Sequence, residues 1–504
     1  MLFSEPAFLF VFLPLLFGLY FVPGLRSLRN PLLLLFSLFF YAWGEKYFVL
    51  MMLVSIAFNY AMGLWVDRGL RQADAKGGAP SRWPIVLTIV GNLGLLGVYK
   101  YADLFAGTVN ALLGPLGLHL DPPGIQLPIG ISFFTFQAMS YVIDVYRRQA
   151  EVQRNPLNIA LYISLFPQLI AGPIVRYKDV AEQIISRVVT SAQFAYGIRR
   201  FIIGLGKKMI IANTCALVAD EIFGAGGAAG NAAMPGVPLD HLTPSLAWLA
   251  VLCYTLQIYF DFSAYSDMAI GLGHMFGFKF LENFNYPYIS QSITEFWRRW
   301  HMSLSTWFRD YLYIPLGGNR GSPARVYRNL LIVFLLCGLW HGASWTFVLW
   351  GLYHGLFLVV ERLGFGSALT RSPRPLRHLY TLLVAMVGWV FFRAETLPQA
   401  FAVLQAMIGF GGTAATAGVW YRPEMYLDVT VTLVILAGVI GATPIWPAIG
   451  KGYERAIAKA AAARVGWMEC SALSLRMVVL GVVFVVAALL VAAGSYSPFI
   501  YFRF

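Results

Sequence analysis

Apolar runs long enough to cross a lipid bilayer recur along the whole of this 504-residue chain. A transmembrane helix needs about 20 consecutive apolar residues, and such runs begin near residues 8, 31 and 47 and recur as far as residues 478–493. Hydrophobic residues make up 59% of the chain and charged residues only 12%, about half the charged share of a soluble domain. A water-soluble core could not bury so much apolar surface, so the sequence predicts a multi-pass membrane protein.

We expect an all-α fold of roughly ten to twelve transmembrane or re-entrant helices that form one membrane domain over residues 1–504. The first run follows Ser4 and Glu5 instead of basic residues, so we interpret it as a retained span and not as a signal peptide. The apolar segment 157–175 is interrupted by Pro167 and Pro173. Proline breaks a helix and frees backbone groups that must be satisfied inside the protein. We therefore predict a re-entrant or broken helix there.

The formal net charge of +13 lies mostly in links between apolar runs, where it indicates topology and not nucleic-acid binding. A link with Arg68, Arg71, Lys76 and Arg82 is predicted to face the cytoplasm. Counting spans from it places the N-terminus and the segment 102–126 on the periplasmic side. Three further links are interpreted in the same way: residues 224–238 as an external loop, and residues 147–154 and 451–464 as cytoplasmic. The basic cluster in the middle of the chain could also receive an anionic donor.

Several classes of protein function lose support because the sequence lacks their motifs. The four cysteines have neither the spacing of metal ligands nor that of a disulfide framework, and we expect no bound metal. No Gly-rich phosphate loop and no nucleophile elbow is visible, which disfavours ATP-driven and hydrolase functions.

His341 lies inside an apolar run, in the segment 337–343. An ionisable side chain at membrane depth is costly and usually faces a cavity or the protein interior, and a histidine exchanges protons near neutral pH. We therefore predict a catalytic role for His341. The alternative is a neutral imidazole that forms hydrogen bonds between helices. His354 follows in the next apolar run, and both interpretations apply to it.

The segment 294–311 combines three tryptophans and three arginines with His301. Interpreted as one helix, it places His301 and two tryptophans on one face, with arginines able to meet anionic groups at the cytoplasmic interface. The alternative is an aromatic belt with arginines that extend to the headgroups. The predicted donor-binding residues are Trp297, Trp300, Arg298, Arg299 and Arg309.

A third polar segment, residues 259–269, carries two carboxylates and several hydroxyl groups within an apolar stretch. Buried carboxylates need partners, and we expect the arginines between residues 298 and 328 to supply them. The segment either forms a structural ion-pair network or takes part in acceptor binding or proton handling. The residues predicted to shape the site are Asp261, Ser263, Tyr265, Asp267, Asn319 and Arg320.

Five segments resemble, in order, motifs of the membrane-bound O-acyltransferase family: residues 127–133, 283–292, 295–301, 313–320 and 339–342. The chain is most similar to the alginate O-acetyltransferase branch, and the similarity extends from residues 40–43 to residues 498–502. The resemblance implies a catalytic core over about residues 125–362. It also implies a helical fold around a central tunnel that opens to both membrane faces.

The resemblance further implies that His341 occupies the family's near-invariant histidine position and that His301 occupies an upstream polar position. The pair would use cytosolic acetyl-CoA as a substrate, with no bound cofactor, in the bacterial inner membrane. His341 would act as general base or accept the acetyl group itself, and His301 would orient the donor or stabilise the thioester oxyanion. Periplasmic acetyltransferase partner proteins would complete the transfer to an exported polysaccharide such as alginate.

Other functions stay open at this point. A proton-coupled transporter or flippase for an anionic lipid or sugar would use the histidines as a proton relay, but it predicts similar broken helices in both halves, and we find one clear break. A non-catalytic secretion scaffold would leave His341 without a purpose. D-alanyl transfer to teichoic acid is possible within the same family, and the acceptor does not follow from the sequence.

Overall fold

The computed structural model describes residues 1–224, 237–410, 415–416, 419–459, 462–494 and 499. Within these residues the fold is helical, apart from one antiparallel pair of two-residue strands, β1 (Ala415–Thr416) and β2 (Val419–Trp420). In the described part of the chain, eight helices are long and apolar enough to cross a membrane, and two bent helix pairs raise the number to ten if each pair is one span. The multi-pass α-helical fold is therefore confirmed. The predicted external loop lies mostly outside the described residues.

Contacts within the chain divide it into two compact units, and the division falls within α9 and α11. Unit 1 comprises Met1–Phe201 and Met268–Leu281, and unit 2 comprises Ile202–Asp267 and Glu282–Phe504. The helices up to this division are α1 (Leu13–Tyr20), α2 (Arg29–Glu45), α3 (Phe48–Lys76), α4 (Trp83–Leu113), α5 (Ile131–Tyr146), α6 (Pro156–Ser164), α7 (Phe166–Leu169), α8 (Tyr177–Ile185) and α9 (Ser191–Gly206). The later helices are α10 (Asn213–Ile222), α11 (Pro244–Phe276), α12 (Ile293–Arg299), α13 (Met302–Phe308), α14 (Pro323–His341), α15 (Trp345–Val360), α16 (Gly366–Arg371), α17 (Arg374–Arg393), α18 (Leu397–Met407), α19 (Val429–Gly441), α20 (Ile445–Lys459) and α21 (Ala462–Ala492).

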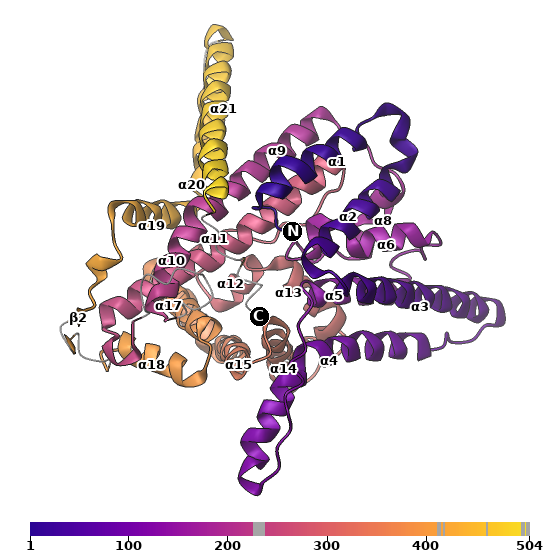
Figure 1. Cartoon of the computed structure of the whole chain (residues 1–504), viewed down its shortest axis with the longest axis horizontal. Helices are drawn as coiled ribbons and strands as arrows, with labels where there is room; N and C mark the ends of the chain where they lie inside the picture. Colours follow the sequence, from indigo (N-terminus) through magenta and orange to yellow (C-terminus); the bar gives the residue numbers. More distant parts are fainter. Residues whose placement is uncertain (225–236, 411–414, 417–418, 460–461, 495–498, 500–504) are drawn as a thin grey trace. The chain divides into compact units, whose positions relative to one another are not determined.

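Unit 1 contains the long helices α3 and α4, which lie side by side (Figure 1). Asn59 and Asn92 join them, because each amide nitrogen donates to the other's oxygen at 3.1 and 2.8 Å. One sequence prediction is corrected here. Helix α3 continues through the polar residues that we assigned to a link and ends at Gly77, which adopts a left-handed conformation; residues 67–76 favour a helix. Helix α4 extends to Leu113, so it includes part of the segment that was predicted to lie on the periplasmic side.

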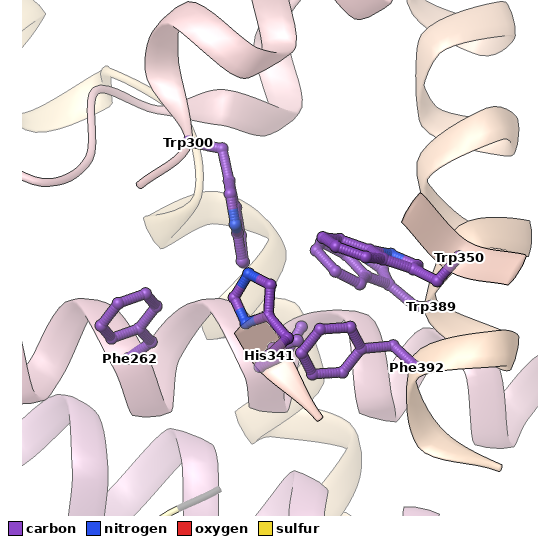
Figure 2. A pocket seen from close by; sticks show the side chains of 7 residues that line it. Phe262, Trp300, His341, Trp350, Trp389 and Phe392 are labelled. Atoms are coloured by element: carbon purple, nitrogen blue, oxygen red, sulfur yellow. The ribbon is translucent and has the colours of Figure 1, made fainter. Parts of the chain in front are cut away.

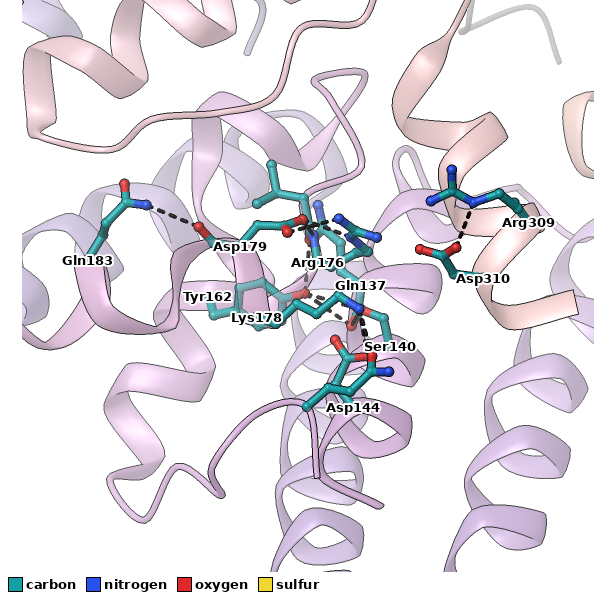
Figure 3. A network of polar contacts seen from close by, with 12 residues as sticks. Gln137, Ser140, Asp144, Tyr162, Arg176, Lys178, Asp179, Gln183, Arg309 and Asp310 are labelled. Atoms are coloured by element: carbon teal, nitrogen blue, oxygen red, sulfur yellow. Dashed lines mark hydrogen bonds and ion pairs between the residues drawn. The ribbon is translucent and has the colours of Figure 1, made fainter. Parts of the chain in front are cut away.

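The broken segment predicted around Pro167 is present in unit 1. Helix α6 ends at Ser164, and α7 is a single turn. The Tyr162 hydroxyl lies 2.9 Å from the carbonyl oxygen of Val175 and 3.2 Å from that of Gln137, and the Gln168 amide donates to the Tyr162 carbonyl at 2.6 Å. Figure 3 shows Tyr162 beside Gln137 in this network. Buried side chains thus satisfy the carbonyl groups of Tyr162 and Val175, which the break leaves without helical partners.

Unit 2 contains the closely packed helix pair α14 and α15. A Cβ atom added at Gly338 would meet the carbonyl oxygen of Phe347, and one added at Gly351 would meet the carbonyl oxygen of Phe334. Only glycine allows the two backbones to approach this closely. The contact fixes the position of His341, which is the last residue of α14.

We expect Gly351→Leu to separate α14 from α15 and to lower both the amount of folded protein and its activity, because overpacking a close helix contact costs about 1–3 kcal/mol or more. Membrane protein yield and thermal stability in detergent measure the effect. Gly97→Leu is the matched control, since a Cβ atom at Gly97 would meet nothing within 4 Å. Equal stability of the two variants would contradict this account of the helix contact.

The C-terminal part of unit 2 differs from the prediction in two ways. The predicted basic link around Lys451 and Arg455 belongs to α20, which follows α19 after a 62° bend. Its Lys, Glu, Arg and Ala residues are good helix formers, so polarity there does not indicate a loop. Helix α18 was not predicted, because its 11 residues are too few to cross a bilayer.

Candidate active site

The aromatic segment around His301 does not form the single helix that we predicted. Helix α12 ends at Arg299, Trp300 is extended, and α13 begins at Met302. His301 stands between the two helices with φ of 43°, in the left-handed region that costs a non-glycine residue about 1–2 kcal/mol. Such strain persists only where the surroundings hold it. The single-helix prediction was therefore wrong, and His301 lies at a structured break.

The beginning of α12 is fixed by two polar side chains. The Ser292 hydroxyl accepts a hydrogen bond from the Glu295 backbone N–H at 3.0 Å, as an N-cap residue does. The Glu361 carboxylate accepts from the backbone N–H groups of Ile293 at 2.6 Å and Thr294 at 3.0 Å. Together they satisfy three of the N–H groups that a helix start leaves free, so the position of α12 before the break is well determined.

His341 lies at the end of α14 and is only 3% exposed. Its ring lies 5.1 Å from Trp350 and 5.2 Å from Phe392, both in edge-on geometry. Figure 2 shows the imidazole in a narrow pocket with aromatic walls. The pocket is lined by Ile258, Phe262, Trp300, His341, Trp350, Trp389 and Phe392. His341 is the only ionisable side chain among these lining residues, so its imidazole is surrounded there by aromatic and aliphatic side chains.

The structure brings together the two predicted catalytic histidines, one at the break between α12 and α13 and the other at the end of α14. Their ring centroids are 6.2 Å apart, and the His301 ring packs edge-on against Phe262 at 4.6 Å. His301 is fully buried. Burial lowers the pKa of the His301 imidazole to about 3, because the charged form loses its hydration. His301 is thus neutral at physiological pH, next to the pocket that holds His341.

The two tryptophans predicted to bind the donor have different places. Trp300 lines the pocket, and its ring lies 4.8 Å from Trp389. Trp297 packs behind the pocket against Trp350 at 5.6 Å and His354 at 5.1 Å. Trp300 is therefore part of the pocket lining, whereas Trp297 lies behind it, and the donor-binding role of both stays a prediction.

The three predicted donor-binding arginines do not line the pocket. Arg299 forms an ion pair with Glu295 at 2.9 Å, and Arg309 pairs with its neighbour Asp310 at 2.8 Å (Figure 3). Arg298 is exposed and has no acidic partner within the part of the chain that the structure describes. Of the three, Arg298 is the most available to an anionic ligand, and the donor-binding role of all three stays a prediction.

The two carboxylates of α11 have other partners than the arginines that we expected. Lys208 pairs with Asp261 at 2.6 Å and Lys207 pairs with Asp267 at 2.7 Å. Both lysines belong to the π-helical turn Lys207–Ala212, between α9 and α10. The prediction was wrong because we sought the cationic partners near the aromatic motif. The acidic face of α11 packs instead against the span that precedes it in the sequence. The network itself is the expected one of buried ion pairs.

The remaining residues predicted to shape the site divide between the interior and the surface. Ser263 and Tyr265 are buried on α11, and the Tyr265 ring packs against Phe499 at 4.9 Å. Asn319 and Arg320 lie in an exposed turn before α14, where Asn319 accepts a hydrogen bond from the Tyr313 hydroxyl at 2.7 Å. None of these four residues lines the pocket, so a direct role of theirs stays a prediction.

Sequence reasoning missed Asn283, whose side-chain oxygen lies 3.1 Å from Nδ1 of His301. It also missed the apolar pocket walls on α11, α15 and α17, because apolar side chains carry no chemical signature. The sequence does contain a signal for Lys207 and Lys208. Two lysines in one apolar run match the charges of two carboxylates in another, which indicates that they form ion pairs. For Asn283, only the fold shows the contact with His301.

Known proteins are similar to this chain over most or all of its length. The family model described as the membrane-bound O-acyltransferase family matches residues 130–392, a range that includes both histidines. The chain is 42% identical to the probable alginate O-acetylase AlgI of Azotobacter vinelandii over the full length of both chains. It is 47% identical to the protein of that name from Pseudomonas aeruginosa over 82% of this chain and 75% of the relative. It is 39% identical to the peptidoglycan O-acetyltransferase of Helicobacter pylori over 82% of this chain and 81% of the relative.

The family match covers more than half of the chain, and full-length similarity to named acetylases accompanies it. The apolar helices place this chemistry in a bilayer. The chain therefore belongs to the membrane-bound O-acyltransferase family and is a multi-pass membrane O-acyltransferase.

Proposed function

We propose that this enzyme transfers acetyl groups from cytosolic acetyl-CoA, across the inner membrane, to an exported polysaccharide. The observation that carries the proposal is the pair His301 and His341, whose rings lie 6.2 Å apart beside a narrow aromatic pocket. Such a pocket suits a small acyl group. The names of relatives that match this chain over its full length make alginate the first acceptor to test.

In this proposal His341 either takes the proton of the attacking hydroxyl group or carries the acetyl group for one step, while His301 hydrogen-bonds to a reactant. Arg298, Arg299 and Arg309 meet the donor phosphates at the cytoplasmic interface. Periplasmic acetyltransferase partner proteins then complete the transfer to the polymer, and the N-terminus of the chain lies on the periplasmic side. The aromatic pocket walls exclude water, which limits hydrolysis of the thioester.

The test compares a deletion strain that carries an empty vector with the same strain that carries the wild-type gene. NMR measures O-acetyl groups on the exported polysaccharide, and the polymer yield is measured in parallel. We expect acetyl groups to disappear on deletion and to return on complementation, with the polymer yield unchanged. Acetylation that survives deletion would contradict the proposal.

Two other outcomes of this test would change the proposed function. Export of the polymer would stop on deletion if the protein were a transporter, a flippase or a secretion scaffold. Peptidoglycan from the same cultures is analysed because the Helicobacter pylori relative is named for that acceptor. If acetyl groups were lost from peptidoglycan alone, the proposed reaction would stand and its acceptor would be peptidoglycan.

A further inference from the structure

Asn283 forms a buried hydrogen-bond cluster around His301. Its Oδ1 atom lies 3.1 Å from Nδ1 of His301, 3.2 Å from the backbone nitrogen of Ser303 and 2.8 Å from the Ser303 hydroxyl. Its Nδ2 atom donates to the Ser266 hydroxyl at 3.0 Å. The side chain of Asn283 is 1% exposed, so water does not compete for these contacts.

The orientation of the Asn283 amide group follows from its neighbours. A backbone N–H can only donate, so the Asn283 atom that faces the Ser303 nitrogen must be the acceptor Oδ1. A flipped amide would direct its NH₂ group at the Ser303 N–H and leave two buried donors opposed. The amide oxygen therefore faces His301 as well.

The same reasoning fixes the proton on His301. Nδ1 faces an acceptor, so Nδ1 must carry the hydrogen, and in a neutral imidazole Nε2 then holds the lone pair. Nε2 is buried and has no hydrogen-bond partner within the part of the chain that the structure describes. A buried acceptor without a partner is costly, and such groups persist where a ligand satisfies them.

We propose that Asn283 is a positioning residue that holds His301 in the Nδ1–H tautomer, so that Nε2 accepts a hydrogen bond from a hydroxyl or amide N–H group of a reactant. This inference rests on the proposed function for the identity of the reaction. Neutral His301 in this tautomer has no proton on Nε2 to give to a thioester oxygen. Of the two roles that the sequence suggested for it, orienting a reactant is therefore favoured over stabilising the oxyanion.

The backbone around His301 is built to maintain this arrangement. The Met302 N–H donates to the Asn283 carbonyl at 3.0 Å, and the Asn285 N–H donates to the Arg299 carbonyl at 2.9 Å. These two bonds hold the loop of Asn283 against the break between α12 and α13. They explain how the left-handed conformation of His301 is held, since that conformation is costly without such support.

A spectroscopic experiment tests the tautomer directly. Full-length protein labelled with ¹⁵N-histidine is reconstituted in lipid vesicles, and solid-state NMR distinguishes protonated from unprotonated ring nitrogens. The His301 signals are identified by subtracting the spectrum of His301→Gln. We expect one tautomer with the proton on Nδ1 in the wild type, and a mixture of tautomers in Asn283→Leu. A protonated Nε2 in the wild type would overturn the inference.

A second experiment measures O-acetyl content in complemented deletion strains at matched membrane protein levels. We expect Asn283→Leu to lower acetylation by about tenfold or more, because a histidine in the wrong tautomer loses most of its function in other enzymes. Asn283→Asp keeps an acceptor oxygen at the same place and should retain most of the activity. Asn285→Leu, in the same loop with an exposed side chain, is the matched control and should behave as wild type.

The outcomes separate this inference from the proposed function. Equal loss in Asn283→Leu and Asn283→Asp, with both proteins stable, would show that the acceptor oxygen is not what matters. Wild-type acetylation in Asn283→Leu would also overturn the inference. If the wild-type gene itself failed to restore acetyl groups, the proposed function would be wrong, and the NMR spectrum would still decide the tautomer.

Discussion

A strain in which His341→Gln replaces the wild-type enzyme should export polysaccharide in normal amount with almost no O-acetyl groups. Glutamine fills similar space and forms hydrogen bonds, but it can neither take up a proton nor carry an acyl group. Loss of a general base costs about 10²–10⁴-fold in rate. His341 is the only ionisable side chain in the pocket lining, so no neighbour in that lining can replace it. NMR of the purified polymer measures the acetyl content.

The control for this experiment is His119→Gln, because His119 is exposed in the segment between α4 and α5. It should acetylate as wild type does. Protein levels and thermal stability in detergent are compared for both variants, since misfolding would also abolish acetylation. A stable His341→Gln protein that acetylates at the wild-type level would show that neither mechanism proposed for His341 operates.

The burial of His341 could be predicted because the signal is local. A histidine within an apolar run is costly at membrane depth and usually faces the protein interior or a cavity. The neighbouring residues alone are enough to recognise this. The same holds for the long spans and for the break at Pro167, where proline cannot continue a helix. These features depend on a few neighbouring residues, so a single sequence suffices to find them.

The break at His301 could not be predicted, because its cause is distant in sequence. Residues 294–311 contain no proline or glycine, and local propensity favours one helix. The conformation is decided by hydrogen bonds to Asn283, 18 residues earlier. Tertiary contacts of this kind override local propensity, and they also determine which histidine nitrogen carries the proton.

Ion-pair partners are hidden for a similar reason. The sequence shows that Asp261 and Asp267 need cations, yet both the arginines after residue 298 and the lysines at 207–208 satisfy charge balance. Only the packing of α11 against the π-helical turn at Lys207–Ala212 selects the lysines. Charge balance therefore predicts that partners exist, and the fold decides which residues they are.

Asp261→Ala should strongly destabilise the protein, because it leaves the ammonium group of Lys208 buried without its carboxylate partner. Lys208 is 4% exposed and Asp261 is 1% exposed, with 2.6 Å between their charged atoms. Removing one member of a buried ion pair costs about 3–5 kcal/mol. We expect a clear decrease in the apparent Tm of the purified protein in detergent and a lower yield from membranes.

The double variant Lys208→Met with Asp261→Leu should recover most of that stability, since apolar residues of similar size often replace a buried pair at little cost. Asp74→Ala is the control for an exposed pair. Asp74 meets Arg148 at the surface, where more than half of each side chain is exposed, and exposed pairs contribute little, so its Tm should stay unchanged. If the double variant regained its Tm but not its acetylation, Asp261 would handle protons in the reaction. If it regained both, the buried pair would hold α11 in place and do nothing more.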